Sequence, residues 1–402
     1  MKSLSRLTMA AAALALATVA VVIGAEIRNN PPAALTVHEW GTFTSVAGDD
    51  GAAVDWDVLG GKDDLPGFIN NRGYRCFKFR LTGTVRMETP VLYFYSARPV
   101  NAHVRVAFPK GLITEWYPQA DYQIDQQSSG GPLYRLPSNL NGIDTSMRSV
   151  VGGVEWTNVK IEPESAAPLP LEKKPSHYYA ARATDAAPVT VGNEHEKFLF
   201  YRGVGRFPVP LSARVSPDGS VVVANTGADP VPMAMLFENR GGRIGYRDAG
   251  AISGPMTLSR PSLDGSLPKL RHDLEEALVA QGLFRKEARA MVETWRDSWF
   301  EEGTRLIYIV PSRAVDAILP LEIAPAPAEI NRVFVGRIEL ITAETRRAVE
   351  AAMLAGDRSI ADRYGRFLEP ILSRMAKENP ANASRIQGFL SSVRMLFESA
   401  CY

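Results

Sequence analysis

A change in hydrophobic period near residue 268 constrains the fold of this 402-residue chain more than any other feature. Before it, from Leu35 to about Gly250, apolar and polar residues alternate or form short β-branched and aromatic runs, which is typical of strands. After it, apolar residues recur every three to four positions, as on one face of a helix. The chain is therefore predicted to be α+β, with an antiparallel β-sandwich-like domain followed by a helix-rich C-terminal region.

Turn residues predict two hairpins in the strand-rich part. Ser216-Pro217-Asp218-Gly219 and Gly241-Gly242 each separate two short apolar runs, and both contain the residues that tight turns favour. Strands are also predicted over residues 305–310, 319–323 and 332–340. Because isolated strands are only marginally stable, we expect these three to return to a sheet.

Helices are predicted over residues 269–281 and 284–302, each followed by a glycine that can end a helix. Thr342 is predicted to cap a helix that runs to about Ala355. Another helix is predicted over 358–378, where Pro370 is expected to introduce a kink, and a last one follows it. The chain then divides as follows: a signal peptide or anchor over 1–25, a spacer over 26–34, a β-sandwich-like domain over 35–255, a mixed α/β segment that packs on it over 256–341, and C-terminal helices over 342–402.

The N-terminal segment predicts export. Lys2 and Arg6 precede a charge-free, apolar run from Leu7 to Ala25, which is the pattern of a secretory signal. The run is also nearly long enough to span a bilayer, so a cleaved signal and an uncleaved anchor are both open. Either way the rest of the chain is expected outside the cytoplasm, periplasmic or secreted, with no membrane contact except through this segment if it is retained.

Charge and cysteine content exclude several classes of protein. With 45 basic and 44 acidic residues the formal net charge is +1, so the basic excess of a nucleic-acid binder is missing and no nucleic acid partner is expected. Two cysteines are too few for a disulfide-dense scaffold or a thiolate zinc cluster. In an exported chain Cys76 and Cys401 could form a disulfide, the alternative being two buried free thiols.

The common catalytic and nucleotide-binding motifs are absent, including GxSxG, HExxH, CxxC, Walker A and GxGxxG. No cofactor is therefore expected. Carboxylates from different strands could still converge into an acid–base pair, and the candidates are Glu39, Glu88 and Glu115.

Histidines and tryptophans supply weaker candidates. His38, His195 and Glu194 carry groups that could bind a hard or borderline metal, although their spacing matches no fixed motif. His38, Trp40 and Trp116 are candidate contacts for a bound ligand. The alternative for His38 and the tryptophans is packing in the core, since each tryptophan of the β region follows an acidic residue that would point to the opposite face of its strand.

Five stretches of the chain resemble a family of uncharacterised exported bacterial proteins that carry a HEWGTFT motif. They are His38–Thr44 (HEWGTFT), Arg86–Tyr93 (RMETPVLY), Gly111–Pro118 (GLITEWYP), Thr294–Pro311 and Arg332–Leu340 (RVFVGRIEL). The resemblance implies one shared architecture and a bacterial envelope setting. It implies no activity, cofactor or site residue.

These observations leave three hypotheses about function. The first is a cell-envelope module that binds a ligand, an envelope polymer or a partner protein, and it fits export together with the missing catalytic motifs. The second is an extracytoplasmic hydrolase that uses convergent carboxylates or a His/Glu metal site. The third is a structural role in assembly, suggested only by the amphipathic C-terminal helices.

Overall fold

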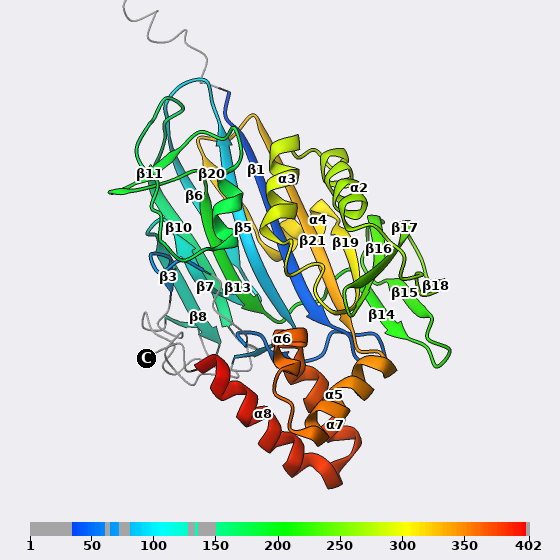
Figure 1. Ribbon diagram of the computed structural model, residues 1–402. Helices are drawn as coiled ribbons and strands as arrows, with labels where there is room; N and C mark the ends of the chain where they lie inside the picture. The colour runs from blue at the N-terminus through cyan, green and yellow to red at the C-terminus, as the bar shows by residue number, and fades with distance from the viewer. Residues whose placement is uncertain (1–33, 61–64, 72–80, 128–132, 136–149, 399–402) are drawn as a thin grey trace, which may run out of the picture.

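The computed structural model describes residues 34–60, 65–71, 81–127, 133–135 and 150–398. Two large β-sheets pack face to face, and helices cover the outer face and one end of the larger sheet (Figure 1). The predicted α+β class, with a β-sandwich-like part and a helical C-terminus, is confirmed. The predicted export segment and both cysteines, Cys76 and Cys401, lie outside the described residues.

The larger sheet has nine strands, which come from widely separated parts of the sequence between residues 36 and 340. In spatial order they are β17 (Arg243–Ile252), β16 (Val231–Arg240), β19 (Gly303–Val310), β21 (Glu329–Leu340), β1 (Thr36–Val46), β5 (Val85–Tyr95), β13 (Leu199–Gly205), β7 (Gly111–Tyr117) and β3 (Asn70–Asn71).

One neighbour pair in this sheet differs from the predicted antiparallel arrangement. β1 and β21 run parallel, with Thr36 opposite Glu329 and Val46 opposite Glu339, whereas the other neighbour pairs of the sheet are antiparallel. The N-terminal half and the returning strands thus meet at the centre of the sheet, where they share one core.

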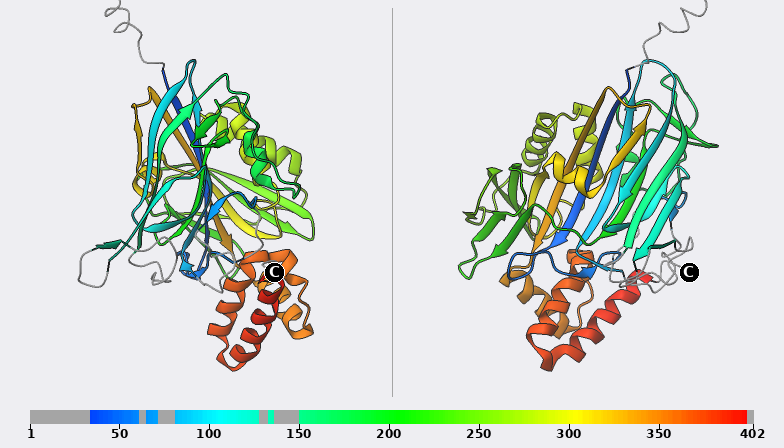
Figure 2. Two further views of the ribbon diagram at one scale, coloured as in Figure 1. Left: turned by 90° about the vertical axis from the view of Figure 1, so that its left-hand side faces the viewer. Right: turned by 180° about the vertical axis from the view of Figure 1, so that it is seen from behind.

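The second sheet has seven strands and lies against the inner face of the first (Figure 2). Its strands are β12 (Glu194–Glu196), β11 (Val189–Val191), β10 (Val150–Ile161), β6 (Val100–Phe108), β20 (Leu321–Ala324), β8 (Asp121–Gln127) and β9 (Leu133–Arg135). Alternate apolar residues of both sheets form the core between them, as period-two strands require; examples are Phe43, Leu92, Val104 and Trp156.

Both predicted hairpins are present. β14 (Leu211–Val215) and β15 (Val221–Asn225) flank the first turn and form a small sheet with β18 (Met256–Leu258). Gly241 and Gly242 join β16 to β17 with φ values of 60° and 82°, which glycine adopts without strain. A two-stranded sheet of β2 (Trp56–Asp57) and β4 (Thr82–Gly83) lies apart from these.

Helices α2 (Leu267–Ala280) and α3 (Arg285–Thr294), with the 3-10 helix η2 (His177–Arg182), cover the outer face of the nine-stranded sheet. α2 begins at the cap Ser266, whose hydroxyl accepts from the backbone of Lys269. The second predicted helix is too long, because α3 ends at Thr294 instead of continuing to residue 302. Residues 295–300 form turns after this end, and the guanidinium of Arg305 binds the backbone carbonyls of Trp299, Glu301 and Glu302.

The C-terminal helices form a layer at one end of the sandwich. They are α5 (Ala343–Ala355), α6 (Ile360–Tyr364), η3 (Gly365–Phe367), α7 (Leu368–Glu378), η4 (Pro380–Asn382) and α8 (Ala383–Glu398). The predicted helix over 358–378 is broken at Gly365, which has a φ of 48°, and not at Pro370. Pro370 lies in the first turn of α7, where a missing N–H costs nothing. Within the described residues, no helix combines the length and apolarity needed to cross a bilayer.

Candidate ligand-binding site

A slot opens in the nine-stranded sheet where β19 is shorter than its two neighbours. β19 ends at Val310, which pairs with Phe334, while β21 extends beyond this point to Glu329 and β16 extends to Val231. Beyond Val310 the chain turns away into α4 (Ser312–Ile318). β16 and β21 are thus separated there by about two strand spacings, each of ~4.8 Å, and none of the described strands lies between them.

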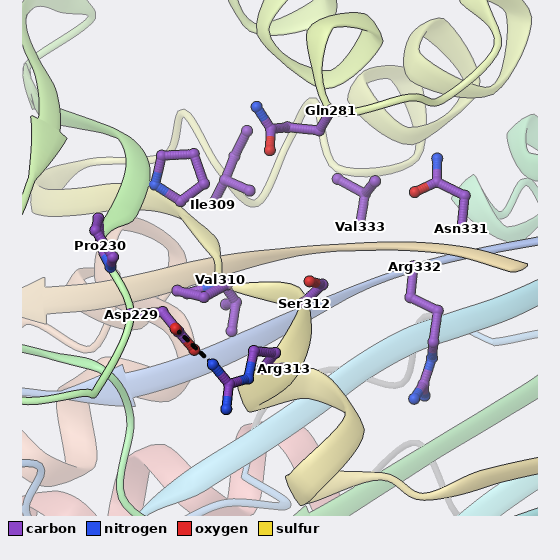
Figure 3. A pocket seen from close by; sticks show the side chains of 12 residues that line it. Asp229, Pro230, Gln281, Ile309, Val310, Ser312, Arg313, Asn331, Arg332 and Val333 are labelled. Carbon is purple, nitrogen blue, oxygen red and sulfur yellow. Dashed lines mark hydrogen bonds and ion pairs between the residues drawn. The ribbon is translucent and has the colours of Figure 1, made fainter.

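The slot holds a pocket of about 370 Å³ (Figure 3), which lies within the range of small-ligand sites. Its walls come from the three strand ends, the start of α4 and the residue after α2. They are Asp229, Pro230, Pro232, Gln281, Ile309, Val310, Pro311, Ser312, Arg313, Asn331, Arg332 and Val333.

The edge of β21 in the slot is open. Residues 329–333 pair with β1 on one side, and within the described residues no strand pairs with them on the other side. Such an edge presents backbone N–H and C=O groups that can pair with another chain. The opposite wall is different, because Pro230 and Pro232 have no N–H to offer.

Two buried donor atoms in the walls of the slot lack a hydrogen-bond partner within the described residues. They are Nδ2 of Asn331 and Nη2 of Arg332, and the two side chains project to opposite faces of β21 (Figure 3). A buried donor without a partner costs about 1–3 kcal/mol. An acceptor oxygen brought by a ligand would remove that cost.

Arg332 connects the slot to Glu39, one of the predicted catalytic carboxylates. Glu39 is fully buried between the two sheets, 2.6 Å from Nε of Arg332, and it also accepts from the hydroxyl of Tyr201. Burial opposes the charge on Arg332, but Glu39, Tyr201 and Asp316 together outweigh it and raise the pKa of the guanidinium. Burial and the same carboxylate raise the pKa of Tyr201 well above its usual value. Glu39 therefore holds a wall residue of the slot in place.

Glu88 and Glu115 lie on the other face of the sheet. Glu88 is buried beneath the C-terminal helices, 2.5 Å from Arg366 and 3.2 Å from Arg86, and Glu115 lies 3.5 Å from Arg202. Because Glu39 points into the core between the sheets, the three carboxylates do not form one site. Glu88 and Glu115 belong instead to a band of buried ion pairs on the outer face.

The electrostatics of Glu88 predict a pH-dependent contribution to stability. Burial alone would raise its pKa, but Arg366, Arg86 and Arg202 together lower it below the usual 4.5. The carboxylate of Glu88 is therefore protonated at a higher pH in the unfolded chain than in the folded one. Its contribution to the free energy of unfolding is present above pH 4.5, and it is lost as the pH falls through the lowered pKa of the folded state.

We expect Glu88→Gln to be less stable than the wild type at pH 7, with the difference shrinking toward pH 3. Urea unfolding of both proteins across this range measures the effect. A stability difference that stays constant between pH 7 and pH 3 would contradict this assignment.

His38 is hydrogen-bonded to a carboxylate from a distant part of the sequence. Its Nδ1 lies 2.8 Å from Oε2 of Glu287, whose other oxygen accepts from the hydroxyl of Tyr95 at 2.7 Å. Glu287 is fully buried in α3 and also accepts from the backbone N–H of Phe284, at the start of that helix. The group fastens α3 to strands β1 and β5.

The predicted metal ligands are not brought together. His195 lies in the seven-stranded sheet and contacts the hydroxyl of Thr190 at 2.9 Å, and Glu194 accepts from the backbone N–H of Gln119. His38 lies on the helix-covered face of the other sheet. Across the described part of the chain, no group of three or more His, Cys, Asp or Glu side chains has metal-binding geometry.

The two candidate tryptophans are core residues. Trp40 has no exposed surface and packs beneath the helices, and Trp116 is buried in the core between the sheets with its ring 4.8 Å from that of Tyr122. Neither presents a flat surface to solvent. Their structure matches the packing alternative.

Sequence reasoning missed the slot and its residues. A signal does exist at its borders, because Pro230 and Pro232 flank the first residue of β16 and Pro311 directly follows β19. Prolines of this kind mark places where strand pairing stops. The signal does not reveal that both places meet at the same point of the sheet.

Comparison of the sequence with models of known families and with curated proteins gave no match. Among solved structures, the chain has a weak similarity to the Fcho1 Mu homology domain of Danio rerio with bound Eps15 peptide. The identity is 9%, the match covers 77% of this chain and 97% of that chain, and the TM-score is 0.29.

Proposed function

We propose that this chain is an exported cell-envelope protein that binds a ligand or partner, with the slot between β16 and β21 as its binding site. The observation that carries this proposal is the open edge of β21 beside two buried donor atoms, Nδ2 of Asn331 and Nη2 of Arg332, for which the described part of the chain offers no hydrogen-bond partner. The apolar run from Leu7 to Ala25 and the resemblance to exported bacterial proteins support the envelope setting.

The hydrolase hypothesis has less support. An acid–base pair of carboxylates must flank one bond within roughly 5–10 Å of each other, whereas Glu39 lies on the opposite face of the sheet from Glu88 and Glu115. A general acid at neutral pH also needs a raised pKa, and the arginines around Glu88 lower its pKa.

Binding assays on the purified protein test the proposal. The ligands are peptidoglycan sacculi, soluble glycans and a phage-displayed library of random linear peptides. We expect saturable binding to at least one class without turnover. Absence of binding to all three classes would overturn the proposal, and turnover of a panel member would favour the hydrolase.

A further inference from the structure

We infer that the slot takes an extended stretch of polypeptide, which lies beside β21 as a continuation of β19. The inference rests on the proposed function, because it names the ligand class of the same site. Its main support is the register of the sheet. Continuing the observed pairing past Val310 places Val333 and Val231 beside the position of Pro311, and Arg332 and Pro230 on either side of the next position in the line of β19, from which the chain has turned away into α4.

The dimensions of the slot fit a short strand. The open edge in the pocket spans Asn331 to Val333, and three residues of a strand cover about 10 Å at ~3.3 Å per residue. β16 and β21 are both antiparallel to β19. A peptide that runs antiparallel to β21 would therefore continue the existing arrangement of the sheet.

The hydrogen-bonding groups favour a peptide main chain over other ligands. An open strand edge offers donors and acceptors in alternation along its length, and an extended main chain is the ligand that matches this spacing. Because Pro230 and Pro232 offer no N–H, the peptide would pair mainly with β21.

Side chains of the bound peptide would alternate between two environments. One face of the slot carries Asn331 and Val333, and the other carries Arg332 and Arg313 (Figure 3). Arg313 is mostly exposed and lies 3.3 Å from Asp229. Alternate peptide positions are thus expected to differ in the residue types that they accept.

The test uses peptides selected from the phage library, synthesised with a fluorophore and titrated against the full chain. Ser312 and Ala317 are both exposed on α4, but only Ser312 lines the pocket. Ser312→Trp should fill the slot and weaken binding at least about tenfold, whereas the matched control Ala317→Trp should change affinity less than about twofold. Circular dichroism confirms that both variants fold.

Backbone pairing is tested separately by N-methylation of each peptide bond in turn. Methylation removes one N–H, so loss of binding at every second position is expected for a strand that pairs along one edge. Hydrogen exchange should also show new protection at Asn331–Val333 on binding. Equal sensitivity at all positions, or none, would overturn the inference.

The outcomes separate the two proposals. Peptides that bind Ser312→Trp as well as the wild type would overturn the inference and leave the proposed function in place. Binding of sacculi or glycans, with no peptide selected, would also overturn the inference and leave the proposed function in place. Absence of binding to all three classes would overturn both proposals.

Discussion

Replacing Arg305 with methionine is expected to destabilise the protein by about 3–5 kcal/mol, because the change removes one partner from a buried ionic network. Arg305 has no exposed surface, and its Nε lies 3.0 Å from a carboxylate oxygen of Glu339. Its guanidinium also donates to the backbone carbonyls of Trp299, Glu301 and Glu302. Methionine fills most of the volume but leaves these acceptors without their donor.

The matched control is Arg347→Met on the surface of α5. Arg347 is 73% exposed and lies 3.7 Å from Glu344, and exposed pairs of this kind contribute about 0–1 kcal/mol. Urea unfolding followed by circular dichroism measures both variants, with the slope of the transition checked for constancy. Similar losses for Arg305→Met and Arg347→Met would show that the network does not depend on Arg305.

Glu39→Leu should have a comparable effect, about 3–5 kcal/mol, because it leaves the buried guanidinium of Arg332 without its main counter-ion. Arg332 is only 7% exposed, so water cannot replace the carboxylate. The hydroxyl of Tyr201 loses its acceptor at the same time. Thermal and urea unfolding of the variant provide the measurement.

A double-mutant cycle distinguishes a lost ion pair from a simple packing defect. Arg332→Leu alone leaves Glu39 as an unpaired buried charge, whereas the double variant Glu39→Leu/Arg332→Leu removes both charges. We expect the double variant to be more stable than either single variant, since apolar replacements of a buried pair are often neutral. Additive losses would mean that the two residues act independently.

The parts of the fold that depend on local sequence could be predicted. Gly241-Gly242 specifies its hairpin through the positive φ values that a two-residue turn requires. The predicted helices over 284–302 and 358–378 differ from the structure at places where hydrophobic periodicity does not decide the conformation. Residues 295–302 have helical spacing, yet the guanidinium of Arg305 binds the carbonyls of Trp299, Glu301 and Glu302. Gly365 breaks a helix that its neighbours would continue.

The candidate site was harder to predict, because it depends on contacts between distant segments. Alternation along β1 places Glu39 and Trp40 on opposite faces, but it does not tell which face meets the second sheet. His38 is hydrogen-bonded to Glu287, which lies 249 residues further along the chain. The slot arises from the relative lengths of three strands, and no single strand carries that information.

The central parallel pair also has a consequence for how the molecule forms. Partners in β1 and β21 are 293 residues apart, as for Glu39 and Arg332. Contacts between such distant segments slow folding, because a long loop must close before they contribute any stability. β1 leaves the ribosome early but has no neighbour on that side until nearly the whole chain has been made. The centre of the sheet is thus completed late in the synthesis of the chain.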